Sequence, residues 1–155
     1  MSCVGTGIVV EISDRTRARV DHERLTALVH HVVRSEGVTD CEVGVQLVGE
    51  RRMATLNRVH RGVRGVTDVL SFPLEQPGEE PPPSGVPRLL GDVVVCPVQV
   101  RRQAAAAGTP PAFELALLLT HGLLHLLGWQ HDEQPGQMAR RQGEILAGWD
   151  WSGLW

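Results

Sequence analysis

The chain has 155 residues, a length that suits one domain with a single hydrophobic core. Acidic residues outnumber basic ones by 18 to 15, and the resulting net charge of −3 does not by itself indicate a nucleic-acid partner. No stretch reaches the roughly eighteen apolar residues of a membrane span, and the first residues lack a secretion signal. The three cysteines lie far apart, which argues against a disulfide framework and predicts a protein of the reducing cytoplasm.

The spacing of apolar residues predicts mostly strands early in the chain and mostly helices later. Residues 8–12 are rich in β-branched side chains, and residues 41–48 alternate apolar and polar as a half-buried strand does. Residues 92–96 are apolar on both faces, which favours a central place in the sheet. In chain order, the predicted strands are 8–12, 41–48, 67–72 and 92–96, and the predicted helices are 21–36, 50–59, 98–107, 110–127 and 136–147.

These elements, joined by short connections, predict an α+β fold in a single domain over residues 1–155. We expect a small mixed four-stranded sheet packed with about five helices. Residues 75–88 contain five prolines, which forbid both a helix and a central strand because proline lacks the backbone donor. This segment is therefore predicted to be an exposed, mobile loop that is too short to link two domains.

Arginines are concentrated in one short segment. The chain has no lysine, and the 14 residues 51–64 hold five of its arginines and no acidic residue. A guanidinium meets phosphate with two hydrogen bonds and stays charged at any biological pH. The segment fits a phosphate-binding surface about as well as it fits an ordinary solvated helix face. Its arginines are Arg51, Arg52, Arg58, Arg61 and Arg64.

Three of the seven histidines, His121, His125 and His131, lie close together in an otherwise apolar segment. Residues four apart on a helix share one face, so His121 and His125 are expected one turn apart. Gly128 can end the helix in the left-handed conformation and let the chain bring His131 back. Three neutral imidazoles at one point favour one zinc ion with a fourth position open to water. The predicted site lies at the end of a buried helix.

The same histidine and glycine spacing occurs in the metzincin proteases, so the motif alone does not define the enzyme. The protease motif has a glutamate directly after the first histidine, and this glutamate activates water at the metal. Here that position is Gly122, which has no side chain to accept a proton. Metalloprotease chemistry in its usual form is therefore disfavoured.

Four sequence blocks together resemble the YbeY family of bacterial ribosome-associated endoribonucleases. The signature of that family is His-Gly-x-Leu-His-Leu-x-Gly-Tyr-Asp-His, and it corresponds to residues 121–131 of this chain. The other blocks keep the family's order and spacing across residues 49–146. They are Thr67-Asp-Val-Leu-Ser-Phe-Pro73, Leu56-Asn57 followed by His60-Arg61, and Leu90-Gly91-Asp92 followed by two valines.

The resemblance implies a zinc-dependent, single-strand-specific endoribonuclease that acts in rRNA processing, at the 3′ end of 16S rRNA, and in ribosome quality control. It implies that His121, His125 and His131 are the zinc ligands and that Arg61 lines the catalytic cleft. Arg61 and His121 are the predicted catalytic residues. The implied partners are single-stranded rRNA and the small ribosomal subunit or its proteins, with no membrane. Two positions depart from the signature: Trp129 replaces its tyrosine, and Gln130 replaces its aspartate.

The general base is not assigned by the sequence. Candidates are Asp132, Glu133, Asp68 and the RNA 2′-hydroxyl, while Asp68 and Asp92 are more simply interpreted as strand-end residues that bond to loop amides. Two other functions fit the motif. One is a zinc hydrolase of a small ester or peptide, and the other is a non-catalytic ribosome-assembly module in which zinc holds a loop.

Overall fold

The computed structural model describes residues 7–75, 79–80, 82–83, 85–129 and 136–155. Within these ranges, no helix is long and apolar enough to cross a membrane. The elements follow the predicted order. They are β1 (Ile8–Asp14), α1 (His22–Ser35), β2 (Cys41–Leu47), α2 (Glu50–Arg61), β3 (Val69–Pro73), β4 (Arg88–Val95), α3 (Pro97–Ala107), α4 (Pro111–Leu126) and α5 (Gln137–Leu146).

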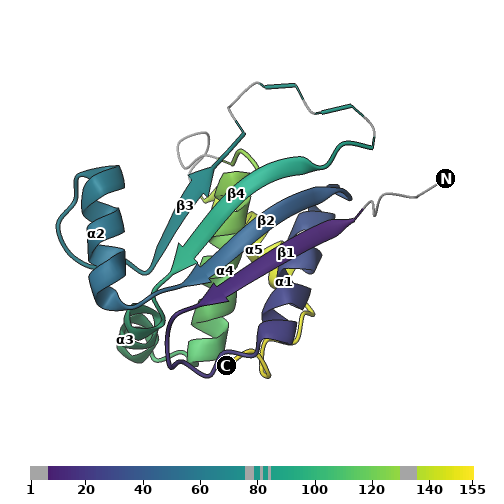
Figure 1. Ribbon diagram of the computed structural model, residues 1–155. Helices are drawn as coiled ribbons and strands as arrows, with labels where there is room; N and C mark the ends of the chain where they lie inside the picture. Colours follow the sequence, from purple (N-terminus) through teal and green to yellow (C-terminus); the bar gives the residue numbers. More distant parts are fainter. Residues whose placement is uncertain (1–6, 76–78, 81, 84, 130–135) are drawn as a thin grey trace.

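The four strands form one mixed sheet in the order β1-β2-β4-β3. β1, β2 and β4 are parallel, and β3 runs antiparallel to β4 at the edge. Figure 1 shows α1, α4 and α5 behind the sheet and α2 beside β3. The α+β class, the four strands, the five helices and the central place of β4 are confirmed.

The main core lies between the sheet and the helices behind it. β2 and β4 alternate so that Val43, Val45 and Val93 face this side and are almost fully buried. Helix α4 packs against β3, β4, α1, α3 and α5, which explains why it is apolar around most of its surface. Because α4 is surrounded in this way, the side chains along it are held in fixed positions.

A second, smaller cluster lies on the opposite face of the sheet, beneath α2. Met53 of α2 packs there with Leu70 of β3 and Val94 of β4. α2 and α4 therefore contact opposite faces of the sheet, and the edge strand β3 lies between them. This placement brings the end of α2 and the histidines of α4 to the same edge of the sheet.

The structure differs from the predicted boundaries where tertiary pairing extends or shortens a strand. β4 begins at Arg88 rather than at residue 92, because Arg88 and Leu89 already pair with β2 ahead of a register shift. Arg88 also forms a two-pronged ion pair with Glu75, at 2.7 and 2.9 Å, which joins the two ends of the proline-rich segment. β3 begins at Val69 rather than at residue 67, because its pairing with β4 starts with Val69 opposite Val95. The carbonyl of Asp68, just before it, accepts from the amide of Cys96 at 2.9 Å.

Candidate metal site

The two helical histidines face each other on α4, as their spacing predicts. The Nε2 atoms of His121 and His125 lie 3.1 Å apart, and their rings meet edge to face. Both side chains are partly buried, so they are open to solvent at one side while the helix backbone behind them is enclosed. The pair thus directs two ring nitrogens toward one point at the surface of the core.

The backbone after α4 orients the second histidine. Nδ1 of His125 lies 2.9 Å from the carbonyl oxygen of Trp129. Because a carbonyl oxygen only accepts, Nδ1 carries the proton and Nε2 is the ring's basic nitrogen. A hydrogen bond of this kind fixes the tautomer and the ring plane of a metal-binding histidine. Trp129 therefore contributes its backbone, and the loss of the signature tyrosine's hydroxyl leaves this contact intact.

Gly128 makes that contact possible. Its φ of +99° is in the left-handed region, and α4 ends just before it at Leu126, as the sequence predicted. The amide of Trp129 donates to the carbonyl of Leu124 at 3.0 Å, and the amide of Gly128 donates to that of His125 at 3.1 Å. These bonds satisfy two of the last carbonyls of α4. They also place the carbonyl of Trp129 beside the ring of His125.

The histidine pair fits one divalent ion. Two nitrogens bound to zinc at 2.0–2.1 Å stand about 3.4 Å apart at a tetrahedral angle and about 2.9 Å apart at a right angle. The observed 3.1 Å lies between these values. The third predicted ligand, His131, lies outside the described residues, as do Gln130 and the candidate bases Asp132 and Glu133. Within the described ranges, no group of three metal-binding side chains occurs.

Gly122 has a packing role in addition to its chemical one. A Cβ there would stand 2.7 Å from Cγ1 of Val93 and 3.2 Å from Cγ2 of Val69, so this face of α4 rests directly on the sheet. A glutamate at this position would point into the core. The geometry therefore agrees with the prediction that no protease-like base follows His121.

Ser71 ties the edge strand to the same turn of the helix. Its hydroxyl donates to the carbonyl of Gly122 at 2.9 Å. Ser71 lies within the Thr67–Pro73 block, but no role for it was predicted from the sequence. The block indicated that this segment matters, but only the packed structure shows that Ser71 is the residue that contacts α4.

The two aspartates of the sequence blocks, Asp68 and Asp92, have separate structural partners. Oδ1 of Asp68 accepts from the amide of Val69 at 2.7 Å and from the hydroxyl of Thr67 at 3.3 Å, which supports its interpretation as a strand-end residue. Asp92 differs from that interpretation. It lies inside β4, and its carboxylate accepts from Nε2 of Gln46 at 3.3 Å rather than from a loop amide. Asp92 lies on the sheet face opposite to that of α4.

Arg61 is the last residue of α2 and is exposed. The neighbouring His60 ring contacts the Phe72 ring of β3, with centroids 4.5 Å apart. Among the described contacts, no hydrogen bond or ion pair joins Arg61 to the histidine pair. β3 connects Arg61 to the site indirectly. His60, next to Arg61, contacts Phe72 of β3, and the neighbouring Ser71 is hydrogen-bonded to α4.

Asn57 holds the loop that follows α2, and sequence reasoning noted it only as part of a block. It is 2% exposed, and its Nδ2 donates to the carbonyl of Gly65 at 3.0 Å. A buried amide at this place fixes the return of the chain from α2 to β3. Asn57 therefore positions the segment that carries Arg61 and Arg64.

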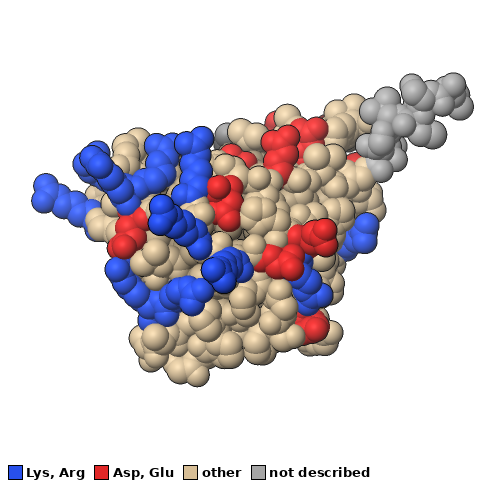
Figure 2. Space-filling model, turned by 60° about the horizontal axis from the view of Figure 1, so that its bottom comes forward, with Lys and Arg blue, Asp and Glu red and all other residues tan. Residues whose placement is uncertain are grey.

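The charge distribution supports an anionic substrate near α2. Figure 2 shows arginines gathered on one side of the molecule, while acidic side chains lie mainly elsewhere on this face. The five arginines of residues 51–64 are all exposed. Glu50, the acidic residue at the start of α2, is already paired with Arg102 of α3 at 2.7 Å.

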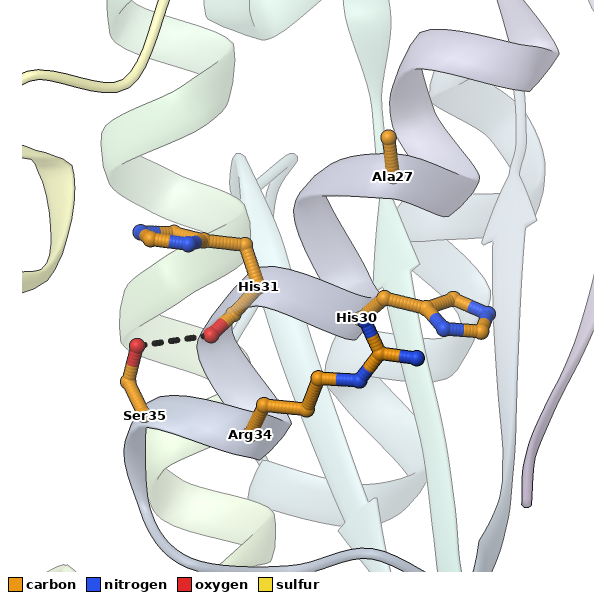
Figure 3. A pocket seen from close by; sticks show the side chains of 5 residues that line it. All are labelled: Ala27, His30, His31, Arg34 and Ser35. Atoms are coloured by element: carbon orange, nitrogen blue, oxygen red, sulfur yellow. Dashed lines mark hydrogen bonds between the residues drawn. The ribbon is translucent and has the colours of Figure 1, made fainter.

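The described residues also form a shallow pocket on α1, lined by Ala27, His30, His31, Arg34 and Ser35. In Figure 3 the rings of His30 and His31 point in different directions. Nε2 of His31 lies 2.5 Å from the carbonyl of Ile145 in α5, so this ring joins two helices. Burial, followed by the charge of Arg34, lowers the pKa of His30. The pocket contains none of the predicted site residues.

The fold and the histidine pair define an α+β domain with a candidate metal site on the helix that supports its sheet. The profile described as "Endoribonuclease YbeY" matches residues 11–150. The chain belongs to the YbeY family of endoribonucleases, which makes it an enzyme that acts on phosphodiester bonds of RNA.

Individual relatives agree with this assignment. An endoribonuclease YbeY from Salinispora tropica is 40% identical over 90% of this chain and 95% of its own length. One from Cutibacterium acnes is 48% identical over 70% of this chain and 72% of its own. A Thermotoga maritima protein with a known solution structure is 27% identical, has a TM-score of 0.62 and covers 91% of both chains.

Proposed function

We propose that this protein is a zinc-dependent endoribonuclease that cuts single-stranded rRNA during maturation of the small ribosomal subunit, at the 3′ end of 16S rRNA, and during ribosome quality control. Such a substrate would place it in the cytoplasm with the small subunit or its proteins as partners. The observation that carries the proposal is the His121–His125 pair, with Nε2 atoms 3.1 Å apart and the second ring oriented by Trp129.

His121, His125 and His131 would hold the ion. Zinc bound there supplies Lewis acidity to a phosphate oxygen and increases the acidity of water. The chain itself provides the other elements of catalysis. The carbonyl of Trp129 keeps the ring of His125 in one tautomer, and Arg61 binds the scissile phosphate and stabilises charge that develops on its oxygens. Because Gly122 has no side chain, another group must accept the proton.

Metal content and RNA cleavage, measured together, test the ligand assignment. His121→Ala and His125→Ala should each lose most bound zinc, read by elemental analysis, and should lose cleavage of a single-stranded RNA. His30→Ala on α1 is the matched control and should keep both. Full zinc content in either ligand variant would contradict the metal site.

A second experiment tests Arg61. Arg61→Gln should lower kcat by about 100-fold, as expected for the loss of one group that stabilises transition-state charge, while zinc content stays unchanged. Arg17→Gln, a change of the same charge at another exposed arginine, should keep kcat. Unchanged kcat in Arg61→Gln would remove Arg61 from the mechanism.

The substrate is tested by mapping cleavage products on precursor small-subunit RNA, with and without ribosomal proteins. Cuts at the 3′ end of 16S rRNA are expected. A zinc-loaded protein that cuts neither this RNA nor a short single strand would favour the non-catalytic assembly module. Hydrolysis of a small ester by the same protein would favour the other alternative.

A further inference from the structure

The outer face of α2 carries a charge pattern that the proposed catalytic site does not use. Arg51, Arg52 and Arg58 are exposed, whereas Met53 and Asn57 are buried on the opposite side of the helix. We call the first three residues the α2 arginine face. At 1.5 Å per residue, Arg51 and Arg58 are two turns and about 10 Å apart along one stripe. Figure 1 draws α2 at the left of the molecule, and the left side of Figure 2 is rich in arginine.

The α2 arginine face has no internal counter-charge in the described structure. No ion pair among the described residues involves its three arginines, and Glu50 is occupied by two hydrogen bonds from Arg102, at 2.7 and 3.3 Å. By contrast, Arg88 and Arg141 each bind a carboxylate outside their own element, Glu75 and Glu36. The positive charge of α2 is thus directed at solvent.

Two of these three arginines do not stabilise the helix, whereas Arg58 lies in its last turn, where the helix dipole favours a cation. Arg51 and Arg52 stand in the first turn, where the positive end of the helix dipole disfavours cations. Like charges on one short segment also repel each other. An external anion relieves both effects, so the placement of Arg51 and Arg52 is better explained by binding than by folding.

The face leads toward the histidine pair. Beyond Arg58, the helix ends at His60 and Arg61, and the His60 ring rests on Phe72 of β3. The preceding residue of β3, Ser71, donates a hydrogen bond to the carbonyl of Gly122 in α4, directly after His121. A chain of contacts therefore connects the arginines to the candidate metal site across a single edge strand.

We propose that the α2 arginine face binds the backbone phosphates of single-stranded RNA outside the position that is cut. The inference rests on the proposed function and adds an RNA-binding surface to it. Arginine forks suit phosphate, and their repetition along a helix suits a polymer that carries one charge per nucleotide. The face contributes affinity and leaves the chemical step to the histidine site.

The test compares two triple variants with the same change in charge. Arg51→Gln/Arg52→Gln/Arg58→Gln removes the α2 arginine face, and Arg15→Gln/Arg17→Gln/Arg19→Gln removes three exposed arginines from the segment between β1 and α1. Binding of a 2′-O-methyl single-stranded RNA, which resists cleavage, is measured by fluorescence anisotropy over a range of salt concentrations.

Three lost phosphate contacts should lower the slope of log K against log salt by about 2, at about 0.7 per contact for a single strand. The Kd of the α2 variant should rise at least tenfold at low salt, whereas that of the control should change less than threefold. Arg51→Lys/Arg52→Lys/Arg58→Lys, which keeps the charge, should keep most of the slope.

Cleavage assays separate this inference from the proposed function. The α2 variant should show a higher KM and an unchanged kcat on long RNA, and parental activity on a substrate of two or three nucleotides.

Equal losses in both triple variants, or an unchanged salt slope, would overturn the inference. Loss of binding to small-subunit proteins with intact RNA binding would also overturn it, in favour of an acidic protein partner. A parent that binds RNA without cutting it would contradict the proposed function alone.

Discussion

Gly122 shows how a single residue can serve both packing and chemistry. It lets α4 lie directly on β3 and β4, and it also keeps a proton-accepting side chain away from the position after His121. Sequence reasoning reached the second role from the metzincin comparison. The first role could not be predicted, because it depends on which strand side chains face that turn of the helix.

We expect Gly122→Ala to lower the free energy of unfolding by about 1–3 kcal/mol, because the added methyl group overpacks the contact with Val93. Gly143→Ala is the matched control. It lies in α5 with open space around it, and the substitution should raise stability by up to about 1 kcal/mol through helix propensity. Chemical unfolding of the two variants measures both values. A stabilised Gly122→Ala would show that α4 can move away from the sheet at little cost.

Two of the three cysteines, Cys41 and Cys96, lie buried in the core. Burial raises the pKa of Cys41 to about 11 and also raises the pKa of Cys96, and both side chains are fully enclosed. Because the thiolate is the reactive form, both residues should resist iodoacetamide at pH 8 in the native protein and react after unfolding. Residue-resolved mass spectrometry measures this. Rapid labelling of Cys41 in the folded protein would contradict its place in the core.

At the scale of elements, the turn between β1 and α1 is held by Asp14. Its carboxylate accepts from the amide and hydroxyl of Thr16, at 2.8 and 2.6 Å, and lies 2.9 Å from Nε2 of His22. Burial acts to raise the pKa of Asp14, but these hydrogen bonds outweigh it and hold the pKa below its ordinary value of 3.8. The ionised carboxylate therefore stabilises the folded protein.

This stabilisation should be fully present above about pH 4 and should be lost as the pH falls through the lowered pKa. Asp14→Asn should cost about 1–2 kcal/mol at pH 7, because it weakens hydrogen bonds to a charged acceptor. The difference from the parent should shrink toward pH 3. Urea unfolding at a series of pH values checks both statements, and a difference that does not depend on pH would contradict the role of the charge.

Helix and strand types were largely predictable, because apolar spacing depends only on which face of an element is buried. The first predicted helix began at residue 21, and the structure has Asp21 as the N-cap of α1; the left-handed turn at Gly128 was also predicted and is confirmed. Boundaries were less predictable. α2 extends to Arg61, beyond the predicted residue 59, and β4 starts at Arg88, because pairing and packing with other elements determine where an element ends.

At the scale of the whole molecule, the last residues of the chain, Leu154 and Trp155, contact helices α1 and α3. Leu154 is fully buried, and its carbonyl accepts from the amide of Asp21 at the start of α1. The ring of Trp155 lies 4.3 Å from the guanidinium carbon of Arg101 in α3. These contacts connect the end of the chain to α1 and α3, far away in sequence.

Leu154→Ala should therefore lower the free energy of unfolding by about 3 kcal/mol, within the range for a fully buried leucine. Thermal unfolding, followed by circular dichroism, measures the loss. Val9→Ala on β1, where the side chain is 47% exposed, is the control and should change stability far less. Equal stability of Leu154→Ala and the parent would show that the C-terminal segment is not part of the cooperative unit.

The sequence alone determined the α+β class, the order of the elements and the shared face of His121 and His125, because all three follow from local periodicity and spacing. The resemblance to the YbeY family also rested on sequence blocks. Only the tertiary structure decided that Trp129 orients His125 through its carbonyl, that Ser71 ties β3 to α4, and that Asp92 faces the other side of the sheet. Such contacts join residues through strand order and packing, which a pattern along one chain does not specify.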